Sequence, residues 1–486
     1  MPHFGLNLKC TNRPRMIEMN AKLNIRSPTI QQLKLPGLIL TVSILCQSCG
    51  GTVSETQLPS ESPSTALEGE LLPSENFSTA VKVELVGSDG NYQLFRDGQP
   101  YLVKGAGIDF GDYEAFARHG GNSFRTWSTD SHGRTGKEVL DIAHSLGLTV
   151  SMTIVMGAEH WGFDYGDAEA VARQYEFARQ EVLALKDHPA LLTWIIGNEL
   201  NLDYRDPRVY DAVNDISKMI HALDPNHPTT TTLAGYGAEV MEVVQTRASD
   251  LDFVSIQAYG SLVLLPGWLA RDNFTKPYFI TEWGAVGHWE VGQTNWGAPI
   301  EQTSTQKAAN YLRSYNEVIR PFPEQVLGNY VFLWGQKQER TGTWYGLFLA
   351  DGEETEPVDV MHYIWNGDWP ENRTPAVDSM TLNGQTSQDN VTLNSNQVYG
   401  AKIVAIDHES DALYYHWELR HESTSTESGG AQEEIPAVIE GLIENSEDSE
   451  IRLRTPTEQG AYRLFVYAYD GYNHAAHANI PFYVNN

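Results

Sequence analysis

Cysteine is almost absent from this chain. Its 486 residues include three cysteines, Cys10, Cys46 and Cys49, and all of them precede residue 50. The rest of the chain therefore has no disulfide, no thiolate nucleophile and no cysteine-based zinc site. Oxidising or reducing surroundings are expected to leave its fold unchanged.

Positive charge is scarce as well. Lys and Arg number 33 against 63 Asp and Glu, which gives a formal net charge of −30, and six of the cations lie in residues 1–50 beside a single acid. A surface this acidic repels phosphate backbones, so nucleic acid is excluded as the expected partner and a neutral ligand is favoured. No GxGxxG or GxxxxGKS/T motif follows any β-like run, and no cofactor is expected.

A metal site is not predicted either. The segment Asp407-His408-Glu409-Ser410-Asp411 offers oxygens that suit calcium, but it lacks the spacing of an EF-hand loop. Between His421 and Ile451 there are nine acids and no Lys or Arg. Such a run is more often a solvated loop than a calcium site, so we assign no metal.

The first residues predict export. Cations precede an apolar stretch from Leu35 to Cys46, which is too short to span a bilayer. The stretch ends in CQSCGG, which resembles a bacterial lipobox with Cys49 as the lipidated residue. We expect residues 1–49 to be a lipoprotein-type signal, and the protein to be lipid-anchored at the bacterial outer membrane or cell surface. A plain cleaved signal with a chance cysteine is the alternative.

Composition divides the remaining chain into parts. Residues 50–79 are rich in Ser, Thr, Pro and Glu and nearly lack bulky apolar residues, which is typical of a disordered linker. Residues 80–372 begin with a hairpin pattern around Asp97-Gly98 and then alternate β-like runs with helical patterns. Residues 373–486 consist of short alternating runs divided by Gly, Asp, Ser and Asn, which predicts a β-sandwich of roughly immunoglobulin size.

The middle part predicts a closed barrel. Helical patterns such as 167–186 and 207–223 separate its β-like runs, and this repetition implies parallel βαβ units. Eight units over about 270 residues match a (β/α)8 TIM barrel better than an open doubly wound sheet. The predicted fold class is therefore α/β, a TIM barrel followed by a smaller all-β immunoglobulin-like sandwich. The runs lie near residues 102–108, 123–127, 148–155, 191–197, 229–233, 252–257, 278–282 and 328–334.

Two glutamates stand at the ends of predicted strands. Glu199 closes the fourth run and Glu282 closes the seventh, and a carboxylate at the C-terminal end of a barrel strand faces the barrel mouth, where active sites lie. Glycoside cleavage needs such a pair, because one carboxyl protonates the leaving oxygen and the other attacks the anomeric carbon. Either glutamate alone is explained as well by a salt bridge at the barrel rim, whereas the pair favours catalysis.

The motifs around these glutamates resemble those of a known group of enzymes. Trp194-Ile-Ile-Gly-Asn-Glu199 and Thr281-Glu282-Trp283-Gly284 are similar to the fourth- and seventh-strand motifs of the large clan of retaining (β/α)8-barrel glycoside hydrolases. The segments 123–127 and 223–228 resemble its second strand and the approach to its fifth. Within the clan, the spacing of the glutamates and the C-terminal domain resemble glycoside hydrolase family 158, which implies endo-action on β-1,3-glucan.

The resemblance, which covers about residues 95–370, implies roles for matched residues. It makes Glu199 the general acid/base and Glu282 the nucleophile. Asn198 is expected to hydrogen-bond the 2-hydroxyl of the cleaved sugar, or else to fix a turn. We expect Tyr259 to touch the nucleophile, and Arg125 to stabilise the charge of Glu282 across the barrel mouth.

Aromatic side chains are candidates for sugar stacking. Trp334, at the end of the eighth run, is expected to floor the subsite of the attacked sugar, with barrel-top packing as the alternative. His160 and Trp161, after the third run, are expected either to form a sugar platform or to anchor their loop. The same two explanations apply to the tryptophans that follow the seventh and eighth runs, Trp289, Trp296 and Trp344.

Functions of different classes remain open. The favoured one is a retaining hydrolase of β-glucan, with laminarin-type β-1,3-glucan first and other β-glucans or β-mannans second; a transglycosylase would use the same glutamates. A non-catalytic glycan-binding surface lipoprotein is less favoured, because an inactive barrel should have lost a carboxylate or Asn198. A structural or adhesive protein would act through the sandwich, but residues 374–486 show no pattern of an aromatic platform strip, although Tyr414, Tyr415 and Trp417 are candidates. We expect a monomer with a polysaccharide or oligosaccharide substrate.

Overall fold

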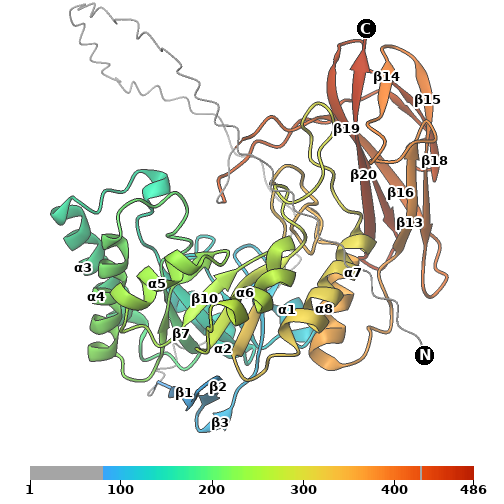
Figure 1. Ribbon diagram of the computed structural model, residues 1–486. Coiled ribbons are helices and arrows are strands. Elements are labelled where there is room, and N and C mark those ends of the chain that lie inside the picture. The colour runs from blue at the N-terminus through green and yellow to red at the C-terminus, as the bar shows by residue number, and fades with distance from the viewer. Residues whose placement is uncertain (1–79, 427–429) are drawn as a thin grey trace, which may run out of the picture. The chain divides into compact units, whose positions relative to one another are not determined.

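The computed structural model describes residues 80–426 and 430–486, and these belong to one compact unit of the chain (Figure 1). The predicted signal, its lipidation residue Cys49 and the predicted linker over 50–79 lie outside the described residues. In the part that is described, no helix combines the length and apolar character needed to cross a membrane.

Parallel strands close into a barrel within residues 103–332. The fifth strand is interrupted at Thr231, so that its first half, β8, pairs with β7 and its second half, β9, pairs with β10. These two halves stand at the ends of the strand order and complete the ring, which confirms the predicted TIM barrel. The strands are β4 (Val103–Gly107), β5 (Ser123–Arg125), β6 (Thr149–Ile154), β7 (Leu191–Ile196), β8 (Thr229–Thr230), β9 (Thr232–Ala234), β10 (Val254–Gln257), β11 (Tyr278–Gly284) and β12 (Val326–Phe332).

Helices follow the strands around the outside of the barrel (Figure 1). Local capping fixes several of their starts: Asp167 caps α3, and Thr135 and Thr303 form capping boxes at α2 and α7. The helices are α1 (Tyr113–Arg118), α2 (Gly136–Ser145), α3 (Ala168–Leu185), α4 (Arg208–Leu223), α5 (Ala238–Arg247), α6 (Leu265–Arg271), α7 (Ser304–Ser314) and α8 (Glu356–Asn366), with short turns η1 (Glu159–Trp161), η2 (Gly260–Leu264) and η3 (Tyr315–Ile319).

Hydroxyl groups fill the middle of the barrel. The Tyr330 hydroxyl lies 2.6 Å from Ser151 Oγ and 3.2 Å from Ser123 Oγ. Side chains alternate along a strand, so Arg125 shares the interior face with Ser123 one step nearer the carboxyl end of β5. In the same way Phe332 lies beyond Tyr330 on β12. The interior faces of β5 and β12 therefore place Arg125 and Phe332 at the mouth of the barrel.

A small antiparallel sheet covers the opposite end of the barrel. It consists of β1 (Val83–Ser88), β2 (Asn91–Arg96) and β3 (Gln99–Pro100), and β2 and β3 join at the predicted turn, where Asp97 and Gly98 have φ values of 51° and 68°. Such positive φ values define the tight turns of two-residue hairpins. Apolar residues of this sheet, including Val83 and Leu94, pack with barrel residues such as Phe279.

Two facing sheets form the C-terminal sandwich in the described residues from Ala376 onward. The core between them includes Trp417, Leu419 and Leu464, which confirms the predicted all-β domain. Helix α8 ends at Asn366 and β13 begins at Ala376, on either side of the predicted boundary at 372/373. The sheets run β13 (Ala376–Leu382), β15 (Val398–Ile406), β18 (Glu450–Arg454), β17 (Ile443–Glu444) and β14 (Thr392–Asn394), β20 (Ala475–Asn485), β19 (Gly460–Tyr469), β16 (Tyr414–His421).

Buried charges join the sandwich to the barrel. Glu301 accepts hydrogen bonds from Lys307 Nζ and from Asn479 Nδ2 of β20, both at 2.6 Å. Burial by itself raises the pKa of Glu301, but the cations beside it, Lys307 foremost, outweigh burial and bring the pKa to about 2. Arg463 of β19 donates to the carbonyl oxygen of Pro299 at 2.8 Å. These contacts fix one sandwich sheet against the loop before α7.

Candidate active site

Glu282, at the end of β11, is a buried carboxylate surrounded by donors. Arg125 Nη1 and Trp127 Nε1 donate to its Oε1 at 3.2 and 2.9 Å. The Tyr259 hydroxyl donates to its Oε2 at 2.6 Å. The side chains of β5 and of the segment after it reach Glu282 because Ser123, Arg125 and Trp127 alternate onto the interior face. These donors, one of them cationic, hold the Glu282 carboxylate in place.

Glu199, just beyond β7, has different surroundings. Gly197 and Glu199 have φ values of 73° and 50°, so the chain turns sharply where the strand ends. The Glu199 N–H donates to Thr232 Oγ1 of β9 at 3.0 Å, which fixes the backbone. A positive φ is uncommon for a residue with a side chain and is held here by the surrounding structure. Among the described residues, no group donates a hydrogen bond to the Glu199 carboxyl.

Electrostatic effects on the pKa of Glu199 also distinguish the two carboxyls. Burial raises the pKa of Glu199 to about 8, the negative charge of Glu282 adds to this effect, and Arg125 opposes it. Glu199 therefore holds its proton at neutral pH. Arg125 links the two strand ends, because its Nη2 donates to Asn198 Oδ1 at 2.9 Å while its Nη1 contacts Glu282 at 3.2 Å. The two glutamates thus meet at one site.

The side-chain carbonyl of Asn198 is held in place by several donors. Its Oδ1 accepts from Arg125, from Gln257 Nε2 at 2.9 Å and from Thr232 Oγ1 at 3.2 Å. With the oxygen engaged on this side, the amide nitrogen of Asn198 faces away from these donors and is available to a ligand oxygen. Gln257 pairs with Glu282 in the sheet, so β10 supports both strand ends.

Tyr259 and Phe332 line the same region. Burial, followed by the charges of Glu282 and Glu199, raises the pKa of Tyr259 well above its ordinary value. Tyr259 therefore stays protonated and donates to Glu282. Its ring meets the rings of Phe332 and Tyr345 edge-on, with centroids 5.8 and 5.6 Å apart. The Phe332 ring also lies 5.6 Å from that of Trp127.

The prediction for Trp334 as a subsite floor is wrong. This residue is fully buried, its Nε1 donates to the carbonyl oxygen of Asp112, and its ring packs against Phe116 and Trp365 under the outer helices. Strand β12 ends at Phe332 and not at Trp334, and beyond Phe332 the chain turns outward. Barrel-top packing, the alternative, describes Trp334, and Phe332 is the aromatic residue of this strand that faces the glutamates.

His160 and Trp161 lie in η1, in the loop after β6. His160 Nδ1 contacts Asp203 Oδ2 at 2.8 Å, which connects this loop to the one after β7. Trp161 is 59% exposed and meets His160 edge-on. In the described residues neither side chain makes a hydrogen bond or ring contact with Glu199 or Glu282. The structure does not bring them into the central cluster, and their platform role stays a prediction.

The other three loop tryptophans lie in different surroundings. Trp289 is 56% exposed, and its ring lies 5.6 Å from that of Tyr259, so it is placed beside the site. Trp344 is buried and donates to the carbonyl oxygen of Val286. Trp296 packs against Tyr483 of the sandwich. Of these three, Trp289 is the one that offers an exposed ring near the glutamates.

Several residues near the glutamates were not predicted. Trp127 was recognisable, since it stands two positions beyond Arg125 on the interior face. Lys337 and Glu339 were not, because they belong to an irregular loop after β12. Lys337 Nζ lies 2.6 Å from Glu339 Oε2. The charge of Glu339 raises the pKa of Glu199, and the charge of Lys337 lowers it.

Oxygen-rich segments do not form a metal centre in the described residues, which contain no group of three His, Cys, Asp or Glu side chains able to hold an ion. Asp407 instead accepts the N–H groups of Glu409 and Asp411 and closes its own turn. In the acidic run after His421, Glu433 accepts the N–H of Arg340.

A closed eight-stranded barrel with a protonated and a hydrogen-bonded glutamate at its mouth defines the class of (β/α)8-barrel glycoside hydrolases. The chain matches the family described as Glycosyl hydrolases family 2, TIM barrel domain, over residues 110–365. This match spans more than half of the chain, so the protein belongs to that family. The predicted class is confirmed, whereas the resemblance to family 158 stays a prediction.

Solved structures with low sequence identity are similar to this chain over part of their length. A calcium binding mutant of Bacteroides uniformis beta-glucuronidase 2 is 15% identical, with 82% of this chain and 47% of that chain covered and a TM-score of 0.47. Bifidobacterium dentium beta-glucuronidase complexed with coumarin-3-O-glucuronide is 20% identical, with 60% and 50% covered and a TM-score of 0.47. This chain thus spans about half the length of these proteins. A search of curated proteins found no match.

Proposed function

We propose that the protein is a retaining glycoside hydrolase that cleaves β-glucan, with internal β-1,3 linkages as its first substrate. The observation that carries the proposal is the contrast between two carboxyls at one site. Glu199 has a pKa of about 8 and keeps its proton, whereas Glu282 accepts hydrogen bonds from Arg125, Trp127 and Tyr259. Acid and nucleophile roles in glycoside cleavage require this inequality.

The reaction follows from these positions. Glu199 gives its proton to the glycosidic oxygen as the bond to the leaving sugar breaks, and a Glu282 oxygen forms a bond to the anomeric carbon. The resulting covalent glycosyl-enzyme is opened by water. Glu199, now ionised, takes a proton from that water. The water oxygen forms a bond to the anomeric carbon as the bond from that carbon to Glu282 breaks. Asn198 offers its amide N–H to the 2-hydroxyl of the sugar.

The charges at the site support a neutral sugar. Arg125 is engaged by Glu282 and Asn198, and Lys337 by Glu339. These cations are already compensated, so they offer little to the carboxylate of a glucuronide, the substrate type named for the related beta-glucuronidases. The choice of β-1,3-glucan among neutral glycans rests on the resemblance to family 158.

A polysaccharide screen tests the substrate. Laminarin, lichenan, cellulose, mannan and galactan would be incubated with the protein, and the products would be sized over time. A chromogenic β-glucuronide serves as the comparison. Early oligosaccharides from laminarin are expected, and products larger than the substrate would reveal transglycosylation. Release from the glucuronide alone would contradict the proposal.

Covalent trapping tests the nucleophile. An activated 2-fluoro-β-glucoside should inactivate the protein and add one fluorosugar to the peptide that contains Glu282, as located by mass spectrometry. A labelled peptide without Glu282 would overturn the assignment. Glu282→Gln, which should remain unlabelled under the same conditions, is the matched control.

Lipid anchoring is a separate proposal that rests on the lipobox-like sequence around Cys49. In cells that process lipoproteins, the full chain should partition into the detergent phase, and Cys49→Ser should move it to the aqueous phase. Equal partition of both forms would contradict lipidation. The expected monomer is tested by light scattering of the chain without residues 1–49.

A further inference from the structure

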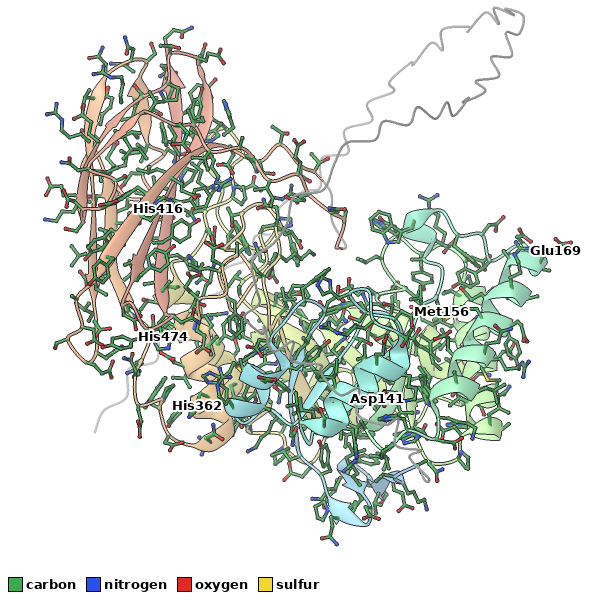
Figure 2. The ribbon with its side chains drawn as sticks, turned by 180° about the vertical axis from the view of Figure 1, so that it is seen from behind. Asp141, Met156, Glu169, His362, His416 and His474 are labelled. Atoms are coloured by element: carbon green, nitrogen blue, oxygen red, sulfur yellow. The ribbon has the colours of Figure 1, made fainter. Side chains whose placement is uncertain are left out.

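A hollow of about 230 Å³ lies between the loop after β12 and one sheet of the sandwich. Loop residues such as Gln336 and Gln338 line one side, and side chains of β16 and β19 line the other. Trp417 and Leu419 of β16 are buried in the sandwich core. Because side chains alternate along a strand, His416 of β16 faces away from that core, toward the hollow. Figure 2 labels His416 on this sheet.

Flat rings lie side by side on this outer face. Tyr414 is paired with Tyr469 across the two strands, and His416 with Tyr467. The His416 and Tyr467 rings are stacked at 6.2 Å with an interplanar angle of 21°, and Tyr467 and Tyr469 are stacked at 6.4 Å and 30°. Tyrosine rings combine an apolar body with a polar hydroxyl, which suits the C–H groups and hydroxyls of a pyranose.

This ring strip corrects an expectation about the sandwich. Trp417 and Tyr415, two of the aromatic residues considered for an adhesive role, face the core instead. Tyr414 is 63% exposed and belongs to the outer face. The strip was not recognisable from sequence, because Tyr467 and Tyr469 come from a strand more than fifty residues later in the chain.

The polar lining favours a neutral ligand. Gln338 Nε2 is buried and has no hydrogen-bond partner among the residues that the structure describes, so it is an available donor in the wall of the hollow. The cations of the lining are compensated: Arg420 lies 2.9 Å from Glu418, and Arg463 lies 2.6 Å from Glu422. The lining thus combines planar amide side chains, aromatic rings and cations that are paired with carboxylates. Such a lining fits an uncharged saccharide better than a phosphate or a uronate.

The loop that lines the hollow also borders the catalytic site. Gln336 and Gln338 face the hollow, whereas the alternate residues Lys337 and Glu339 act on Glu199. Lys337 Nζ lies 5.7 Å from the centre of the Phe332 ring. The same short segment therefore separates the two sites, and a long glycan chain held in the hollow stays close to the glutamates.

We propose that this hollow is a second saccharide-binding site, which takes segments of neutral β-glucan outside the catalytic subsites and retains polysaccharide at the enzyme. The identity of the sugar rests on the proposed function, while the existence of the site rests on the ring strip and on the Gln338 donor, which has no partner in the described part of the chain.

Binding is tested with the full-length protein carrying Glu282→Gln, so that no substrate is consumed. Its migration in native gels that contain laminarin, lichenan or mannan would be compared with that of the same protein carrying His416→Ala and Tyr469→Ala. Loss of two stacking rings should weaken retardation by roughly tenfold in apparent affinity. Tyr472→Ala, which removes a 62% exposed tyrosine outside the hollow, is the matched control and should change nothing.

Activity gives an independent measure. In the active enzyme the double variant should raise KM for polysaccharide several-fold while leaving kcat/KM for a small aryl β-glucoside unchanged. If the double variant melts at a lower temperature than its parent, Gln338→Leu, which removes the donor and keeps the volume, replaces it with the same expected outcome.

The outcomes separate this inference from the proposed function. Undiminished gel retardation and an unchanged KM in the variants would overturn the second site, even if laminarin is hydrolysed. Retardation by anionic rather than neutral polysaccharides would overturn it too. Ring-dependent retardation by a neutral glycan that the enzyme does not cleave would support the second site and contradict the proposed function.

Discussion

The ends of β7 and β11 carry the same side chain in opposite surroundings. Glu282 accepts hydrogen bonds from Arg125, Trp127 and Tyr259. The Glu199 carboxyl lacks such donors among the described residues, and burial raises its pKa to about 8. The fold thus assigns the roles through the number of donors that it directs at each carboxyl, since both side chains are glutamates.

The largest expected effect comes from changing Glu282, the carboxyl that is surrounded by donors. Glu282→Gln removes the nucleophile and should lower kcat on laminarin by about 10⁵-fold. Circular dichroism and the melting temperature are the controls for an intact fold, because the residue lies at the barrel mouth. A fall of only a few-fold would show that another group forms the covalent intermediate.

Changing Glu199, the carboxyl with the raised pKa, should give the next largest effect. Glu199→Gln should lower polysaccharide hydrolysis by about 10²- to 10⁴-fold, because no acid protonates the leaving sugar. A dinitrophenyl glycoside has a leaving group that needs no proton, so formation of the glycosyl-enzyme from it, seen as a burst, should persist. An equal loss in that burst and in polysaccharide hydrolysis would contradict the acid role.

Removing single hydrogen-bond donors to Glu282 tests how much each of them contributes to the difference between the two carboxyls. Tyr259→Phe and Trp127→Phe each remove one hydrogen bond to the carboxylate and should lower kcat/KM by about 10- to 100-fold. Tyr345→Phe is the matched control, since its hydroxyl accepts the N–H of His288 and makes no hydrogen bond with Glu282 among the described residues. If all three variants lose activity equally, packing of the rings rather than donation to Glu282 is responsible.

The smallest effect concerns the pH profile. The negative charge of Glu339 helps to raise the pKa of Glu199, and Lys337 opposes it. Activity requires protonated Glu199, so kcat/KM should fall as pH rises through about 8. Glu339→Gln should lower the Glu199 pKa and move this alkaline limb to lower pH, whereas Lys337→Met should move it to higher pH. Shifts in the same direction would rule out a direct electrostatic effect.

Much of the barrel was predictable because its strands are short apolar runs that end at polar turns. The β-like runs ending near Glu199 and Glu282 correspond to β7 and β11, and their parallel arrangement brings the two ends to one mouth. The sandwich strand β20 was not predicted. It is buried on both faces, with His477 and Asn479 bonded to the barrel, so it shows no simple alternation of apolar and polar residues.

The site was predictable only as far as regular strands extend. Arg125, Asn198 and Tyr259 stand at or just beyond strand ends, and the structure brings them to the glutamates. The error at Trp334 arose because the eighth run was taken to end at residue 334, whereas β12 ends at Phe332. Lys337 and Glu339 act on Glu199 from an irregular loop, and no periodicity specifies where such a loop places its charges.

The salt bridge under the sandwich bears on how this protein is shortened or recombined. Glu301 and Lys307 belong to the barrel, yet Asn479 completes their shell and Arg463 binds the neighbouring Pro299 carbonyl. A barrel cut free after α8 would open this ion pair to water and leave its partners missing. The sandwich therefore cannot be exchanged freely. A domain put in its place must supply an amide for Glu301 and a guanidinium for the Pro299 carbonyl oxygen at the same positions.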